Sequence, residues 1–150
     1  MDGSTIQAPE LADQNFALAV PAGLVAALIG AVIWAAVTYV TQMEIGLIAV
    51  AVGALTGVTV KRVGRGVGAH FGFLGAGCAA LGWALGMLLS DIAFLANTRN
   101  LSLLEAAQVL NPAGLVRLAG AAFQPMDLLF LGIAVYEGYK FSFERRRAGQ

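Results

Sequence analysis

Charged side chains are scarce in this chain: of its 150 residues, only 12% are Asp, Glu, Lys or Arg. A soluble domain carries roughly 25%, and so few charges could not cover a soluble globule of this size. The nine acidic and nine basic side chains cancel, so the chain lacks the net positive charge of a nucleic-acid-binding protein. The single cysteine, Cys78, excludes a disulfide within the chain.

Apolar residues are abundant instead. They make up 59% of the chain, and a further 19 residues are glycine. Hydrophobicity this high also excludes an intrinsically disordered protein. The class that remains is a helical membrane protein.

Four stretches approach the length of about 20 residues that a helix needs to cross the hydrocarbon layer. They are residues 18–40, 45–60, 71–90 and 126–143. The second is short, so it either crosses with its ends anchored at the interfaces or is re-entrant, and we favour a crossing. The fourth is interrupted by Glu137 and Lys140, and its flanking residues support it more than its hydropathy does.

The basic residues test this assignment, because Lys and Arg gather on the cytoplasmic side of membrane proteins. If all four stretches cross, one side receives only Arg99 and Arg117. The other side receives Lys61, Arg62, Arg65, Lys140, Arg145, Arg146 and Arg147. We therefore predict an all-α, polytopic transmembrane bundle of four helices with both termini in the cytoplasm.

The chain divides into a transmembrane domain and two short terminal tails. Residues 1–17 contain no Lys or Arg, so we expect a cytoplasmic tail rather than a cleaved signal peptide. Residues 18–143 form the predicted transmembrane domain, and residues 144–150 form a basic cytoplasmic tail. Arg145, Arg146 and Arg147 could contact anionic lipid, although three arginines after a crossing are most often a topology anchor.

Residues 97–125 are too long for a tight turn and too polar to cross the membrane. Ser102 followed by Glu105 has the spacing of a capping box. Asn111 before Pro112 has the pattern of a helix N-cap followed by proline at the first helical position. We expect two short interfacial helices on the outer surface of the membrane.

Small residues line one face of the third predicted helix at spacings of three and four. In lipid, such ridges let helix backbones approach closely. The helix-packing residues that we predict are Gly46, Gly53, Gly57, Gly68, Gly72, Gly75, Ala79, Gly82 and Gly86. The ridges either form a seam in an oligomer or pore, or pack the first three helices against one another. We favour packing within the chain.

Glu137 is the carboxylate expected deepest in the bilayer, about 15 Å along the fourth helix from Asp127. A buried acid there either lies on a proton or cation path or pairs with Lys140 one turn later. The internal ion pair is the favoured interpretation. Asp91 and Asp127 are expected at the outer boundary, where solvated helix ends explain them better than a cation site does.

Several parts of the sequence resemble a group of uncharacterised bacterial four-span membrane proteins. The similar parts are Gly30–Tyr39, Glu44-Ile45-Gly46, the glycine-rich turn after Lys61, and Phe123–Phe130. The likeness covers about residues 20–143. Some members carry a zinc ribbon at the amino end, which is absent here because Cys78 is the only cysteine. The group has no established activity, so the resemblance supports the topology only. We separately expect the protein in a bacterial inner (plasma) membrane.

Residues for enzymatic chemistry are missing. The chain shows no serine–histidine–acid set and no nucleotide motif, and one histidine, His70, does not make a zinc site. We therefore expect no catalytic, cofactor-binding or metal-binding residues. The prediction is a non-enzymatic accessory or scaffold subunit in the lipid bilayer, alone, as a homo-oligomer or in a larger membrane complex. The alternative is a small oligomeric channel or carrier for protons or cations that uses Glu137.

Overall fold

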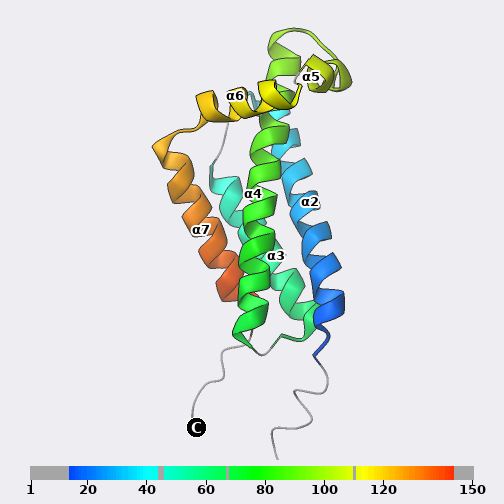
Figure 1. Ribbon diagram of the computed structural model, residues 1–150, viewed down its shortest axis with the longest axis vertical. Coiled ribbons are helices and arrows are strands. Elements are labelled where there is room, and N and C mark those ends of the chain that lie inside the picture. Colours follow the sequence, from blue (N-terminus) through cyan, green and yellow to red (C-terminus); the bar gives the residue numbers. More distant parts are fainter. Residues whose placement is uncertain (1–13, 44–45, 67, 110, 144–150) are drawn as a thin grey trace, which may run out of the picture.

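The computed structural model describes residues 14–43, 46–66, 68–109 and 111–143. Over these residues it is entirely helical. The helices are α2 (Phe16–Thr41), α3 (Leu47–Gly64), α4 (Ala69–Thr98), α5 (Leu103–Val109), α6 (Pro112–Ala122) and α7 (Pro125–Phe141). Figure 1 shows α2, α3, α4 and α7 running alternately up and down, with α5 and α6 across one end of the bundle. The prediction of an all-α chain is confirmed for the described residues.

Three of the long helices could cross a membrane by their length and composition: α2, α3 and α4. Over its described residues, the segment predicted at 45–60 forms one continuous helix from Leu47, which extends to Gly64. The fourth long helix, α7, has 17 residues and is about 25 Å long at ~1.5 Å per residue. It is shorter than the ~30 Å hydrocarbon layer, and it is not among the three candidate spans.

Local chemistry explains the helix ends. The side chain of Asn15 accepts a hydrogen bond from the Leu18 N–H at 3.0 Å and caps the start of α2. Helix α2 ends at Thr41, and its C-cap residue, Gln42, adopts a left-handed conformation with φ of 54°. Arg65 ends α3 in the same way, with φ of 48°. The short turn that follows makes α3 and α4 antiparallel neighbours (Figure 1).

Helix α4 is the longest helix, and the two short helices α5 and α6 pack against it. Ser102 and Glu105 exchange hydrogen bonds at the start of α5: the Ser102 N–H donates to the Glu105 carboxylate at 2.8 Å, and the Glu105 N–H donates to Ser102 Oγ at 3.2 Å. Asn111 Oδ1 accepts from the Gly114 N–H at 2.7 Å and caps α6. The capping box and the N-cap predicted from sequence are therefore both present.

Helices α3 and α4 lie in the middle of the bundle, with α2 packed on both and α7 packed on both. The interior consists mainly of small residues. One buried cluster joins Trp34, Ala49, Val52 and Ala134, and another joins Ala19, Val60 and Phe71. Large apolar side chains point outward instead, with Phe73 70% and Val40 79% exposed. This distribution suits a protein whose outer surface lies in lipid rather than water.

Candidate functional site

Two features of the bundle concentrate the residues with a potential role. One is a set of close helix contacts made by small residues. The other is a polar cavity at the end of the bundle that carries α5 and α6.

The close contacts are tightest where α7 crosses α3 and α4. A methyl group added at Gly57 would lie 2.8 Å from the Gly138 carbonyl oxygen, and one added at Gly138 would lie 2.7 Å from the Gly75 carbonyl oxygen. A methyl group at Gly53 would collide with the Ala134 backbone, and one at Gly75 would collide with Ser142 Oγ. Real Cβ atoms do not approach other atoms this closely, so these positions require glycine in this packing.

The contacts between α2 and its neighbours follow the same principle. A methyl group at Gly82 would lie 2.7 Å from Val52 Cγ1 and 3.3 Å from the Ala27 Cα. Gly86 faces the six-membered ring of Trp34, with 2.5 Å between the added methyl and Trp34 Cε3. Ala79 is fully buried. Gly82 thus packs toward α2 and α3, and Gly86 packs toward α2.

The lower part of the ridge differs from that expectation, in which the first three helices packed against one another. Gly72 lies against Tyr139 and Phe143, so it contacts α7 and the residues that follow it. Gly46, the N-cap of α3, likewise lies against the Phe130 ring of α7. The reason is a ridge on α7 that the sequence reading missed: Ala134, Gly138 and Ser142 recur every four residues and are all buried. In the sequence, the charged residues Glu137 and Lys140, which flank Gly138, dominate this segment, so the spacing of small residues was not identified.

The sequence places Gly68 both in the turn before the third helix and at the start of the ridge of small residues on that helix. In the structure it is the N-cap of α4 with an extended backbone, and an added methyl would meet the ring of His70, two residues away. Gly68 therefore lies in the turn between α3 and α4 rather than among the residues that contact another helix.

Glu137 and Lys140 do not form an ion pair with each other in the described structure. Lys140 Nζ lies over the rings of Tyr136 and Phe141, 5.7 and 5.5 Å from their centroids, a cation–π arrangement. Helix α7 ends at Phe141, so Glu137 is about 6 Å from its end by helical rise. The acid therefore lies closer to the carboxyl end of α7 than to Asp127 at its start. Arg145, Arg146 and Arg147, the predicted lipid contacts, lie outside the described residues.

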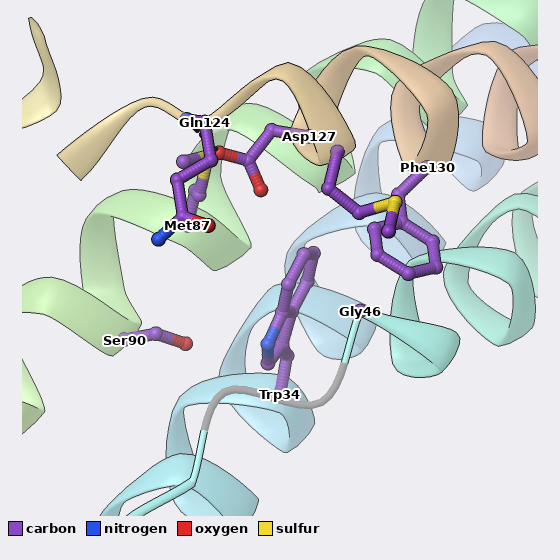
Figure 2. Close-up of a pocket in the computed structure, with 8 residues that line it drawn as sticks. Trp34, Gly46, Met87, Ser90, Gln124, Asp127 and Phe130 are labelled. Carbon is purple, nitrogen blue, oxygen red and sulfur yellow. Dashed lines mark hydrogen bonds between the residues drawn. The ribbon is translucent and has the colours of Figure 1, made fainter.

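The polar cavity occupies about 260 Å³ where the ends of α2, α3 and α7 meet the flank of α4. Its walls are the side chains of Trp34, Met87, Ser90, Gln124, Met126, Asp127 and Phe130, with Gly46 at one edge. Figure 2 shows the indole of Trp34 standing in the middle of these groups, with Ser90 on one side and Phe130 on the other. Three helices and a turn thus converge on one polar space.

Hydrogen bonds position the polar side chains around this cavity. The Gln124 N–H donates to one oxygen of the Asp127 carboxylate at 2.6 Å, and the Asp127 N–H donates to the Gln124 carbonyl oxygen at 2.9 Å. Deeper in the bundle, Thr38 Oγ1 donates to Ser90 Oγ at 3.2 Å. Ser90 therefore keeps its own hydroxyl proton for another acceptor.

Trp34 is the exception in this network. Its side chain is only 5% exposed, and its indole Nε1 is buried without a hydrogen-bond partner. Buried polar groups are nearly always paired, with protein or with a bound molecule. Sequence reasoning could not find this group, because its burial depends on the contact between α2 and Gly86.

Histidine, cysteine and acidic side chains do not gather into a metal site among the residues the structure describes. Comparison of the chain with protein-family models, with curated proteins and with solved structures finds no match. Its function is therefore argued from its own geometry.

Proposed function

We propose that this protein is a non-enzymatic integral membrane protein that acts as an accessory or scaffold subunit. In this proposal it resides in a bacterial inner membrane, alone, as a homo-oligomer or within a larger complex. The small-residue ridges set a close spacing between its helices, and its apolar outer surface is left for lipid and for other membrane proteins.

The observation that carries the proposal is the approach of α7 to α3 and α4. Gly53, Gly57 and Gly75 meet the backbone or the short side chains of α7, so these helices touch along much of the length of α7. Interiors packed this closely leave little room for a water-filled lumen. A rigid packed unit is what a scaffold subunit requires.

We further propose that α7 is a fourth crossing. Its packing alongside α3 and α4 supports this, because a helix in contact with two candidate spans lies at the same depth as they do. A short span is accommodated when the bilayer thins or flanking residues reach the interface. The arginines at 145–147 then anchor the cytoplasmic end, and both termini lie inside the cell.

A proton or cation path past Glu137 is the competing function. The backbone carbonyl oxygen of Glu137 lies 3.2 Å from a methyl group placed at Gly57. Helix α3 therefore covers the face of α7 that points into the bundle beside Glu137. A path would have to run along another face of α7. This is the alternative that a direct experiment should exclude.

Flux measurements on the purified protein in liposomes separate the two functions. We expect no proton or cation flux above that of protein-free liposomes, for the protein and for Glu137→Gln alike. Mild-detergent purification should in turn show whether the protein is alone, forms a homo-oligomer or co-purifies with another membrane subunit. Flux that Glu137→Gln abolishes would overturn the scaffold proposal.

A further inference from the structure

We propose that the polar cavity beside Trp34 binds a small organic ammonium that also carries an oxygen acceptor, the chemistry of an ethanolamine group. In this arrangement the ammonium lies at Asp127, and the oxygen accepts from Trp34 Nε1 and Ser90 Oγ. The inference goes beyond the proposed scaffold function and does not depend on it.

The unpartnered indole is the first observation. Trp34 Nε1 can only donate a hydrogen bond, and it is buried without an acceptor. In Figure 2 the indole nitrogen is on the side of the ring that faces Ser90. The Ser90 hydroxyl accepts from Thr38 and keeps its proton to donate. The indole N–H therefore has no protein acceptor, and the Ser90 hydroxyl, which lines the same cavity, has a proton to donate. An oxygen atom in the space between these groups would accept from both.

The charge of the lining is the second observation. Among the described residues that line the cavity, Asp127 is the only one with a formal charge. One of its oxygens accepts from the Gln124 N–H, and Figure 2 shows the other directed toward the indole. A carboxylate oxygen in a cavity whose described lining has no basic side chain disfavours an anion and accepts readily from an ammonium.

The aromatic walls fit the same cation. Trp34 and Phe130 both line the cavity, and aromatic ring faces attract ammonium groups. The partial positive charge at the start of α7 opposes a cation, but Asp127 lies in the first turn of that helix and offsets it. The balance of charges in the cavity is therefore negative.

The volume limits the size of the ligand. At a share of ~30 Å³ for each water molecule in the liquid, a cavity of about 260 Å³ exceeds what one bridging water fills. It is large enough to accommodate an ethanolamine group. The cavity is lined by Gln124 and by the first turn of α7, so it lies at the end of the bundle where α7 begins. The group could therefore come from a phospholipid headgroup or from a free amine.

Binding is tested on the full-length protein in detergent, by isothermal titration with ethanolamine. Propylamine, which lacks the oxygen, and ethanol, which lacks the ammonium, are the matched probes. We expect ethanolamine to bind at least about tenfold more tightly than either, since a hydrogen bond to a charged group contributes enough for such a change. Equal affinity for all three probes would overturn the proposal.

Variants locate the site. Asp127→Asn keeps an oxygen for the Gln124 N–H but removes the charge, and it should weaken ethanolamine binding about tenfold. Trp34→Phe removes the donor and keeps a ring, and it should weaken binding by a smaller factor. Glu105→Gln removes a carboxylate outside the cavity and should leave binding unchanged. Unchanged binding in a folded Asp127→Asn protein would refute the site, with folding checked by circular dichroism and gel filtration.

The source of the group is tested by native mass spectrometry after incubation with vesicles. Vesicles of phosphatidylethanolamine are compared with vesicles of phosphatidylglycerol. Retention of phosphatidylethanolamine that Asp127→Asn abolishes identifies a lipid headgroup. Binding of free ethanolamine without lipid retention identifies a soluble amine. If neither the lipid nor free ethanolamine binds, the cavity holds water only and the proposal falls.

Discussion

At the scale of single residues, the identity of a helical glycine matters where another helix packs directly against it. Gly75 and Gly77 are two residues apart on α4, yet a methyl group at Gly75 would collide with Ser142 Oγ and the Gly138 carbonyl oxygen, whereas one at Gly77 would meet nothing within 4 Å. The pair therefore separates the packing role of a glycine from its helix propensity.

We predict that Gly75→Ala destabilises the protein by about 1–3 kcal/mol, because the α7 backbone must move away. Gly77→Ala should be neutral or stabilise the helix by up to about 1 kcal/mol, because alanine favours the helical conformation. The free energy of unfolding is measured by denaturant titration in mixed micelles. Similar losses for both variants would mean that the contact between α4 and α7 is not formed.

The same contrast repeats on the facing helix. Gly132 has open space around it, whereas a methyl at Gly138 would lie 2.7 Å from both Ala79 Cβ and the Gly75 carbonyl oxygen. Gly138→Ala should therefore behave like Gly75→Ala, and Gly132→Ala like Gly77→Ala. The sequence shows where these glycines are but not which residues they contact. Residue spacing predicts which residues share one face of a helix, but it does not predict which other helix packs on that face.

At the scale of elements, sequence patterns were most informative where the chemistry is local. The cap of α5 and the cap of α6 involve residues three apart, and both were identifiable from Ser102, Glu105 and Asn111. The end of α7 was placed too late, near 143 rather than Phe141, because helix termini depend on weak local preferences. The cavity needs three helices to assemble and has no sequence signature at all.

The α5 cap makes a pH-dependent element. Hydrogen bonds from the Ser102 backbone N–H, and secondly from its hydroxyl, lower the pKa of Glu105. A carboxylate whose pKa is lowered in the folded state stabilises that state above its ordinary pKa. The stabilisation is lost as the pH falls through the lowered value, so α5 should begin to fray at its first turn only in that acidic range.

Ser102→Ala tests this relation. The variant removes the hydroxyl donor and keeps the backbone N–H, so the pKa of Glu105 should rise part of the way toward its ordinary value. The pKa is read from the Glu105 side-chain carbon by nuclear magnetic resonance. Leu103→Ala, at an exposed neighbouring position, is the control and should leave it unchanged. An identical midpoint in the protein and in Ser102→Ala would contradict the capping role of the hydroxyl.

At the scale of the whole molecule, the described residues at the amino and carboxyl ends lie at the same end of the bundle as the turn between α3 and α4 (Figure 1). That end carries Lys61, Arg62 and Arg65, while α5 and α6 lie at the opposite end. If the bundle spans the membrane as a unit, the positive-inside rule places the turn in the cytoplasm and the polar cavity outside. The proposed ligand would then be met at the outer surface.

Cysteine labelling tests both the orientation and the fourth crossing. In a Cys78→Ala background, single cysteines replace Ala69 at the start of α4, Gln108 in α5 or Gln150 at the carboxyl end. An impermeant maleimide applied to intact cells should label Gln108→Cys alone, and Ala69→Cys and Gln150→Cys only after permeabilisation. The background protein is the control and should stay unlabelled. Labelling of Ala69→Cys from outside would invert the orientation, whereas labelling of both Gln108→Cys and Gln150→Cys from outside would mean that α7 packs on the other helices without crossing, because a crossing places these two positions on opposite sides.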